Sequence, residues 1–247
     1  MYLSQSQQKK IKSLTTKKNR QKLSLFRIDR KKIVLEAINE NTFPLEYLLM
    51  TQDHFDKNDW GEGVQEKIII ASQKQLNNIS NHKNQGKLIG VFKTLGYKNK
   101  KDNEQKWEIG LWDVQDPSNF GAILRIADWY NINQVICSSN TVDLFNPKVI
   151  DASMGSFLRV TVQYTEMYSF LTNYKLPIYK TQMNGRSIYE QEKMGGLILI
   201  GNESNGIPIE LVGENIHEIG IPKIGSAESL NASVACGIVV DRLVGNC

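Results

Sequence analysis

The residues from Leu197 to Gly201 constrain the fold more than any other stretch of the chain. Four consecutive apolar side chains with a glycine on either side predict a short buried strand. The strand leads at once into the loop Gly201-Asn202-Glu203-Ser204-Asn205-Gly206, whose glycines permit a tight turn with exposed backbone around one carboxylate. A loop of this kind is a common ligand site in α/β proteins, although an ordinary strand-to-helix turn also explains it.

The composition is that of a globular protein with a core. Of the 247 residues 40% are hydrophobic and 23% are charged, which suits one large domain or two small ones. No apolar run approaches the roughly 18 residues of a membrane helix, and no apolar segment at the N-terminus indicates secretion. The three cysteines and three histidines are scattered. We therefore expect a cytoplasmic protein without disulfides, a metal site or a membrane partner.

The first 32 residues form a strongly basic segment. Against one acid, Asp29, they contain eleven lysines and arginines, whereas the rest of the chain has 19 basic and 25 acidic residues. The eleven are Lys9, Lys10, Lys12, Lys17, Lys18, Arg20, Lys22, Arg27, Arg30, Lys31 and Lys32. Concentrated positive charge at one end of a mildly acidic chain indicates a surface that binds phosphate backbones. A basic helix that is merely solvated is the alternative.

Residues 1–96 form a predicted N-terminal domain in which helices and strands alternate. We expect helices at 5–24, 31–39 and 72–80, and strands at 24–30, 44–50, 67–71 and 88–92. The stretch 96–106 is polar and contains no apolar run, so we place a linker at 97–108. The first domain is therefore a small layered α/β domain, and none of its residues has a catalytic pattern.

Residues 109–247 form a second predicted domain. The expected strands are 109–113, 134–138, 157–162, 177–180, 197–201 and 218–221, and the expected helices are 120–131, one from 146, 165–174 and 229–244. Strands and helices that alternate at short spacing are typical of a mostly parallel sheet with helices on both faces. The fold class is α/β in both domains.

The segment Asn119-Phe-Gly-Ala-Ile-Leu-Arg125 is a second candidate for a functional site. We expect Asn119 to be the N-cap of the helix that follows. Arg125 lies four residues after Gly121, so both belong to one helix face, and the glycine leaves room beside the guanidinium. An arginine that snorkels or pairs with Asp128 explains this isolated charge without any function.

The third candidate runs from Ile221 to Ser233, where a strand leads into the last helix. Ser229 and Asn231 fall at the beginning of that helix, where backbone amides can form a cradle for a polar ligand. Capping explains Ser229 but does not explain Asn231 two residues later. The glycine spacing of dinucleotide fingerprints and the lysine of phosphate loops are absent, which argues against a nicotinamide-dependent oxidoreductase or a nucleotide hydrolase.

The order of the three segments along the chain is distinctive. It is Asn-x-x-Gly-x-x-Arg, then Ile-Gly-Asn-Glu-x-x-Gly-Ile, then Ile-Pro-x-x-Gly-x-x-Glu-Ser-Leu-Asn-x-Ser. This order closely resembles the SpoU-type (TrmH-like) RNA ribose 2′-O-methyltransferases of the SPOUT superfamily. The resemblance covers residues 109–245 closely and the N-terminal part loosely, where 12–26 and 85–91 follow the family's small substrate-binding domain. Ser204 departs from the family, which commonly has glycine there.

The resemblance implies methyl transfer from S-adenosylmethionine to a 2′-hydroxyl of RNA, a trefoil knot in the last third of the chain, and a homodimer. It also implies a catalytic set, namely Arg125, Asn119, Glu203, Ser229 and Asn231. Contacts to the cofactor are implied at Thr181, Gly201, Ile221, Ile224 and Leu230. Guanidinium normally stays protonated, so Arg125 can instead hold a phosphate or stabilise developing alkoxide charge.

Ribosomal RNA is the expected substrate, because the family's shorter tRNA-modifying members lack an N-terminal domain of this kind. A tRNA 2′-O-methyltransferase is one alternative. A non-catalytic RNA-binding protein on the same fold is another, and the absence of S-adenosylmethionine binding would favour it.

Overall fold

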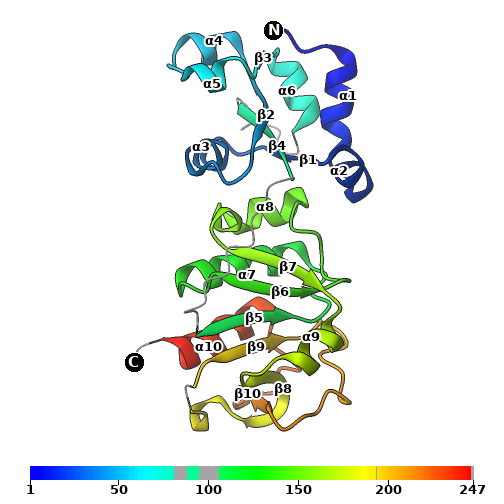
Figure 1. Cartoon of the computed structure of the whole chain (residues 1–247), viewed down its shortest axis with the longest axis vertical. Helices are drawn as coiled ribbons and strands as arrows, with labels where there is room; N and C mark the ends of the chain where they lie inside the picture. The colour runs from blue at the N-terminus through cyan, green and yellow to red at the C-terminus, as the bar shows by residue number, and fades with distance from the viewer. Residues whose placement is uncertain (81–87, 95–105, 193, 246–247) are drawn as a thin grey trace. The chain divides into compact units, whose positions relative to one another are not determined.

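The computed structural model describes residues 1–80, 88–94, 106–192 and 194–245, which form two compact units (Figure 1). Unit 1 comprises the described residues of 1–98 together with Phe145–Leu158, and unit 2 comprises those of 99–144 and 159–247. Most of the linker that the sequence places at 97–108 lies outside the described residues, as do residues 85–87 of the family resemblance.

Unit 1 is built on a four-stranded sheet in the order β1–β4–β2–β3. Its strands are β1 (Leu25–Ile28), β2 (Leu45–Met50), β3 (Ile68–Ile70) and β4 (Leu88–Lys93), and β4 runs antiparallel to both of its neighbours. The helices are α1 (Gln5–Ser13), α2 (Lys17–Leu23), α3 (Lys31–Glu40), α4 (Gln52–Asp56), α5 (Glu62–Gln65) and α6 (Gln73–Ile79). Apolar residues of α1 and α6 pack on Leu49, Ile89 and Val91 of the sheet and form one side of the core.

The single helix predicted for residues 5–24 is wrong, because two helices occupy this stretch. Helix α1 ends at Ser13, and the first turn of α2 begins after Thr16, which has an extended backbone. The buried Arg20 stabilises the break, since its Nη1 donates to the carbonyls of Leu14 and Thr15, each at 2.9 Å. A basic residue that the sequence pattern suggests is exposed therefore has a structural role.

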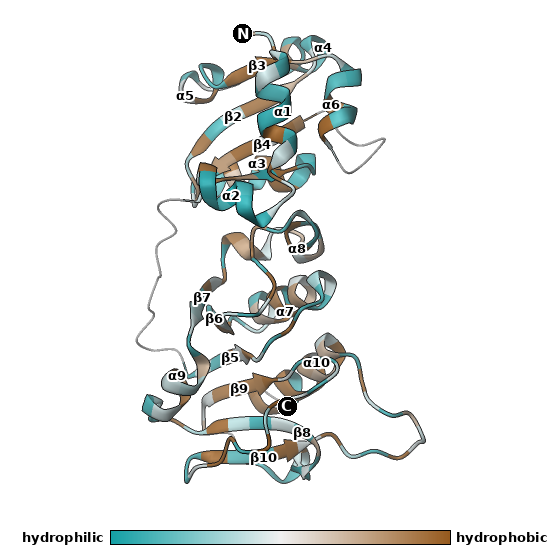
Figure 2. Cartoon of the chain, turned by 90° about the vertical axis from the view of Figure 1, so that its right-hand side faces the viewer, coloured by the Kyte–Doolittle hydropathy of each residue, from teal (hydrophilic) through white to brown (hydrophobic). Residues whose placement is uncertain are grey.

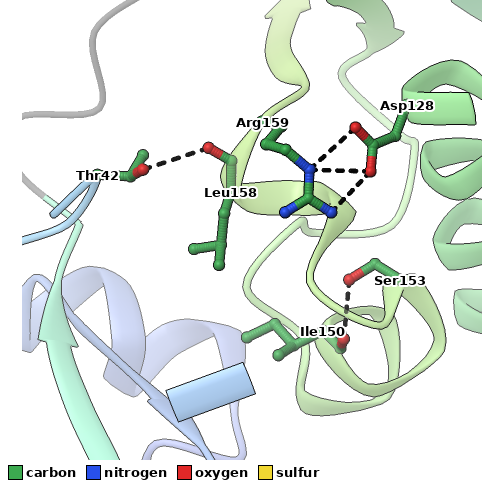
Figure 3. Close-up of polar contacts among 6 residues, drawn as sticks. All are labelled: Thr42, Asp128, Ile150, Ser153, Leu158 and Arg159. Atoms are coloured by element: carbon green, nitrogen blue, oxygen red, sulfur yellow. Dashed lines mark hydrogen bonds and ion pairs between the residues drawn. The ribbon is translucent and has the colours of Figure 1, made fainter. Parts of the chain in front are cut away.

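A short segment from the second half of the sequence completes the core of unit 1. It contains α8 (Pro147–Ser153) and the 3₁₀ turn η1 (Ser156–Leu158). The ring of Phe26 lies 4.5 Å from that of Phe145 and 6.2 Å from that of Phe157, and Phe43 packs against both. The hydroxyl of Thr42 donates to the Leu158 carbonyl (Figure 3). Aromatic packing and polar contacts thus join sequence positions more than 100 residues apart.

The strand predicted at 157–162 is also wrong in its position. Residues 156–158 form η1, and the strand β7 covers Thr161–Thr165. Gly155 has φ +101°, which turns the chain before Phe157 so that this ring enters the aromatic cluster. Contacts with distant residues decide the local structure here.

Unit 2 contains a six-stranded sheet in the order β10–β8–β9–β5–β6–β7, and every pairing within it is parallel. The other strands are β5 (Trp107–Leu111), β6 (Gln134–Ser138), β8 (Ile178–Ser187), β9 (Gly196–Ile200) and β10 (Ile216–Gly220). The strand predicted at 197–201 is β9, which is fully buried between β8 and β5. The prediction of a mostly parallel sheet is confirmed.

Helices cover both faces of this sheet. Leu197 and Leu199 of β9 pack with Met167 and Leu171 of α9 (Met167–Asn173). The opposite side of β9 contacts α10 (Ala232–Val244), which lies beside α7 (Pro117–Trp129). Figure 2 shows α9 on one side of the sheet and α7 and α10 on the other, with apolar residues along β9 between them. Because the strands are parallel, the loops after β5, β9 and β10 all leave the sheet at the edge formed by the carboxyl ends of the strands. The starts of α7 and α10 lie near this edge.

We expect Phe157→Ala to lower the free energy of unfolding of unit 1 by about 3–5 kcal/mol, because it leaves a cavity within the aromatic cluster. Urea unfolding combined with hydrogen exchange of the β1 and β4 amides measures the loss. The exposed Tyr2 is the matched control, and Tyr2→Ala changes stability by less than about 0.5 kcal/mol. Protection of β1 and β4 that is unchanged by Phe157→Ala would contradict this packing.

Candidate active site at the ends of the central strands

The loop that follows β9 is closed by its own backbone. The N–H of Asn202 donates to the Gly206 carbonyl at 3.3 Å, and the Gly206 N–H donates back at 3.0 Å. Gly206 has φ +65°, and a Cβ on Gly201 would lie 2.7 Å from the Gly206 carbonyl carbon. Both glycines are required by geometry, as their spacing in the sequence predicts.

Helix α7 begins earlier than the sequence pattern predicts, and Asn119 is not its N-cap. The cap is Asp116, whose Oδ1 accepts from the N–H groups of Ser118 (2.7 Å) and Asn119 (3.0 Å). Pro117 takes the first helical position, where its missing N–H removes no hydrogen bond. The side chain of Asn119, which is 6% exposed, is therefore free to make contacts elsewhere.

Helix α10 begins at Ala232, so the start predicted at Ser229 is also wrong. Asn231 is the N-cap, and its Oδ1 accepts from the backbone N–H groups of Ser233 (3.0 Å) and Val234 (3.3 Å). Capping therefore accounts for the oxygen of the Asn231 amide. Its nitrogen remains available as a donor to another part of the chain.

A chain of side-chain hydrogen bonds joins the three candidate segments. Nδ2 of Asn231 donates to Oδ1 of Asn119 at 2.8 Å, and Nδ2 of Asn119 donates to Oε1 of Glu203 at 2.8 Å. A carboxylate only accepts and a helix N-terminus only donates, so both amides have a single consistent orientation. Helix α7, the loop after β9 and the start of α10 are thereby held in one arrangement.

Ser233 also belongs to this network, although it is not among the residues expected from the sequence. Its Oγ donates to Oδ1 of Asn231 at 2.7 Å and lies 3.4 Å from Oδ1 of Asn119. The Asn-x-Ser spacing at the helix start is the sequence signal that could have identified it. Ser229, which the sequence did select, is exposed and makes no hydrogen bond to any described residue.

Arg125 lies on the exposed side of α7, and its guanidinium makes no hydrogen bond or ion pair within the part of the chain that the structure describes. The partner suggested by the sequence, Asp128, is occupied. Figure 3 shows that both carboxylate oxygens of Asp128 accept from Arg159, at 2.7–3.0 Å. The interpretation of Arg125 as the ion-pair partner of Asp128 is therefore wrong.

The residues expected at the cofactor lie in β8 and in the segments that follow β9 and β10. Thr181 is half-buried in β8, where its hydroxyl donates to the Leu199 carbonyl at 2.8 Å. Gly201 follows β9, and Ile221 follows β10. Ile224 is fully exposed and Leu230 is half-exposed. Figure 2 shows the segment between β10 and α10, which holds the last two, extending away from the sheet.

Lys180 is a fully buried cation beside these loops, and it is not among the residues expected from the sequence. Its Nζ donates to Oε1 of Glu218 at 3.0 Å and to the Leu211 carbonyl at 3.1 Å. The hydrogen bond from Lys180 lowers the pKa of the Glu218 carboxyl. Lys180 thus ties the segment before β10 to the sheet, and no sequence motif marks it.

Other side chains of unit 2 are less informative for chemistry. Cys137 and Cys236 are buried, and desolvation raises the pKa of the Cys236 thiol to about 12. In the described ranges no cluster of His, Cys, Asp or Glu could hold a metal ion. No helix in those ranges has the length and apolar character needed to cross a membrane.

Comparison with known proteins identifies the family. The model of the SpoU rRNA methylase family matches residues 106–241, a span that contains every residue of the hydrogen-bonded network. The chain belongs to the SpoU rRNA methylase family. Residues 6–90 match the MRM3-like substrate binding domain, so the two matches cover both halves of this SpoU-family chain.

Individual relatives extend the similarity over nearly the whole chain. The 23S rRNA (guanosine(2553)-2′-O)-methyltransferase RlmP of Bacillus subtilis is 26% identical over 95% of this chain and 94% of its own. The structure of a putative RNA methyltransferase of the TrmH family from Porphyromonas gingivalis has a TM-score of 0.84, with 26% identity and 98% of both chains covered. The structure of an AdoMet-bound rRNA methyltransferase from Sinorhizobium meliloti shares the fold, with a TM-score of 0.83 and 23% identity. The similarity covers 98% of this chain and 95% of that protein.

We expect Asn119→Asp to destabilise unit 2 by about 1–3 kcal/mol at neutral pH, because a second carboxylate then faces Glu203 while the contact with Asn231 is kept. Two adjacent carboxylates raise the pKa of one of them above its unfolded value near 4. The loss is therefore small at lower pH and grows as the pH rises through the raised pKa.

Urea unfolding between pH 4 and pH 8 measures this dependence. Adding Glu203→Gln restores a donor opposite the introduced carboxylate and returns most of the stability. An Asn119→Asp variant as stable as the wild type at every pH would show that the Asn119–Glu203 hydrogen bond does not form in solution.

Proposed function

We propose that the chain transfers a methyl group from S-adenosylmethionine to a ribose 2′-hydroxyl of RNA, and that ribosomal RNA is its substrate. One observation carries most of this proposal. The hydrogen bonds from Asn231 to Asn119 and from Asn119 to Glu203 join the three segments that match the family, and Arg125 lies exposed on the same helix as Asn119. Among the chain's relatives, RlmP carries the name of a 23S rRNA 2′-O-methyltransferase.

The residues in β8 and in the segments after β9 and β10 fit S-adenosylmethionine. Exposed apolar side chains, Ile224 and Leu230, can pack on an adenine ring. Gly201 and Ile221 follow β9 and β10, and Thr181 lies in β8 just after its pairing with β9 ends, so all three can offer backbone groups to its polar atoms. When bound, the cofactor supplies an electrophilic methyl group. The AdoMet-bound relative from Sinorhizobium meliloti has the same fold and supports this assignment.

Positioning supplies much of the catalysis in such a transfer, because the hydroxyl oxygen must approach the methyl carbon in line. The Asn119–Glu203 and Asn119–Asn231 contacts keep the loops of the site fixed before substrate binds. The guanidinium of Arg125 is proposed to hold the adjacent phosphate or to stabilise negative charge on the ribose oxygen. A phosphate oxygen or a water then accepts the hydroxyl proton. Ser229 is the remaining member of the proposed catalytic set, and it lies in the exposed segment between β10 and α10.

Eight exposed lysines of unit 1 form the surface proposed to bind the RNA backbone. They are Lys9, Lys10, Lys12, Lys17, Lys18, Lys22, Lys31 and Lys32. The three arginines of the basic segment have other partners. Arg20 holds the α1–α2 break, Arg27 forms a buried ion pair with Asp29, and Arg30 pairs with Asp151. In the proposed division of the chain, residues 1–96 form the RNA-binding domain, residues 97–108 form the linker, and residues 109–247 form the methyltransferase domain. The similarity over nearly the whole chain to RlmP, a protein named for 23S rRNA, supports ribosomal RNA over tRNA, and a cytoplasmic location suits that substrate.

A trefoil knot formed by the last third of the chain is part of the proposal. Backbone segments pass very close to one another there. A Cβ on Gly185 would lie 2.3 Å from the Ile219 carbonyl carbon, and one on Gly220 would lie 2.7 Å from the Gln182 carbonyl oxygen. These close approaches fall at the register shift where β10 pairs with β8, and the knot itself is proposed from the family resemblance.

We also include a homodimer in the proposal. Trp129 of α7 and Val234 of α10 are exposed, and Ile224 and Leu230 add apolar surface in the segment before α10. Exposed apolar side chains of this size are typical of surfaces that another protein covers. Sedimentation equilibrium at micromolar concentration tests this, and a mass of one chain at every concentration would contradict it.

We expect Arg125→Ala to reduce methyl transfer at least about 100-fold, because it removes the cation proposed to lie at the reacting oxygen. S-Adenosylmethionine binding, measured by calorimetry, stays within about twofold of wild type. Stability changes by less than about 0.5 kcal/mol, since the side chain is exposed. Lys175→Ala, another exposed cation of unit 2, is the control and keeps full activity.

Near-normal turnover of Arg125→Ala would remove Arg125 from the catalytic set. A wild-type chain that binds RNA but gives no heat with S-adenosylmethionine would instead favour a non-catalytic RNA-binding protein.

We expect the replacement of Lys9, Lys12, Lys17 and Lys18 by glutamine to weaken RNA binding and to flatten its salt dependence. Each lost phosphate contact reduces the slope of log affinity against log salt by about 0.7–0.9, so four contacts reduce it by about 3. The control replaces four exposed lysines outside the segment, namely Lys57, Lys74, Lys148 and Lys175. An equal slope for the two variants would show that the basic segment does not bind the RNA backbone.

A further inference from the structure

We infer that Asn202 is the positioning residue that sets Glu203 against Asn119, through a hydrogen bond from its side chain to the backbone of Asp113. The role in catalysis rests on the proposed function, whereas the contact itself belongs to the fold. Asn202 touches neither of the proposed reactants, so it acts through the carboxylate of Glu203.

Asn202 makes hydrogen bonds with all four of its polar groups. Its backbone N–H and C=O both pair with Gly206. Its side-chain Oδ1 accepts from the N–H groups of Ser204 (2.8 Å) and Asn205 (3.0 Å), which folds the loop around the amide. Its Nδ2 donates to the carbonyl of Asp113 at 2.7 Å. The oxygen thus shapes the loop, and the nitrogen attaches the loop to the end of β5.

The carbonyl that receives this bond is itself fixed. Asp113 has φ +55°, a left-handed conformation that costs energy for a residue other than glycine. The buried Ser138 holds it there, because the Asp113 N–H donates to Ser138 Oγ at 2.8 Å and Ser138 Oγ donates to Asp113 Oδ1 at 2.5 Å. Asn140 Nδ2 donates to the other carboxylate oxygen at 3.2 Å. Asp113 therefore presents its carbonyl in one direction.

Glu203 depends on this anchor because, among the described residues, a single hydrogen bond holds its side chain. Its side chain is exposed, and among the described residues its hydrogen-bonding partner is Asn119. The backbone bonds between Asn202 and Gly206 close the loop on itself, and the bond to Asp113 attaches the closed loop to the end of β5. A misplacement of about 1 Å can cost about 100-fold in rate. The anchored loop keeps Glu203 within reach of the Asn119 amide.

The test uses Asn202→Asp in the full-length protein. This substitution keeps an oxygen that accepts from Ser204 and Asn205, and it replaces the donor to Asp113 by a second oxygen. Asn205→Asp is the matched control, because it adds the same charge to the same loop at an exposed side chain that makes no hydrogen bond to the described residues. Two readouts are compared, namely hydrogen exchange of the loop amides and the steady-state kinetics of methyl transfer to RNA.

We expect Asn202→Asp to raise exchange of the Ser204, Asn205 and Gly206 amides at least about 10-fold and to lower kcat by about 10- to 100-fold. KM for RNA changes less than about threefold, since the RNA-binding surface is untouched. In a Glu203→Gln background Asn202→Asp lowers kcat by less than about twofold further, because its effect passes through Glu203. Asn205→Asp leaves exchange and kcat near wild type.

Exchange rates that stay at the wild-type level in Asn202→Asp would overturn the anchoring role. A full additional loss of kcat in the Glu203→Gln background would overturn the action through Glu203. A wild-type protein that transfers no methyl group would overturn the proposed function instead, and the exchange rates would still decide whether Asn202 anchors the loop.

Discussion

The candidate site depends on the orientation of one side-chain amide, that of Asn119. Its nitrogen must face Glu203, because a carboxylate cannot donate, and its oxygen must therefore face the Asn231 nitrogen. The Asn231 oxygen is then left for the amides at the start of α10. A change at any one of these groups leaves a donor or an acceptor without its partner, which costs more than the hydrogen bond itself contributes. The network consequently selects one arrangement of helix and loops.

The parallel sheet makes this arrangement possible. Parallel strands end at the same edge, so the loop after β9 and the segment after β10 come close to the start of α7, which follows β5. Glu203 and Asn231 lie 84 and 112 residues from Asn119 in the sequence, respectively. Polar bonds between such distant segments are made only in the folded chain, and they prepare the site before any ligand arrives. This preorganisation suits a reaction in which positioning supplies much of the rate.

The sequence predicts the central features of the fold because they have local causes. The apolar run of β9 requires a buried strand, and the glycines of the next loop are needed for its geometry. The errors arise where distant contacts decide the outcome. Residues 157–162 have the composition of a strand, yet Phe157 packs against the rings of Phe26 and Phe43 in the core of unit 1. The sequence suggests that Arg20 is a surface charge, whereas in the structure it is buried and donates to the carbonyls of Leu14 and Thr15.

The site follows the same rule. Asn119, Glu203 and Asn231 stand in motifs that the family resemblance marks, whereas Ser233 and Lys180 are identified only through the atoms they contact in the structure. The most direct test of the proposed methyl transfer is an assay with the purified protein. The protein is incubated with methyl-labelled S-adenosylmethionine and total RNA, and the RNA is then digested to nucleosides. We predict that the label appears in a 2′-O-methyl nucleoside derived from ribosomal RNA. Label on a base, label confined to tRNA, or no label in RNA would contradict it.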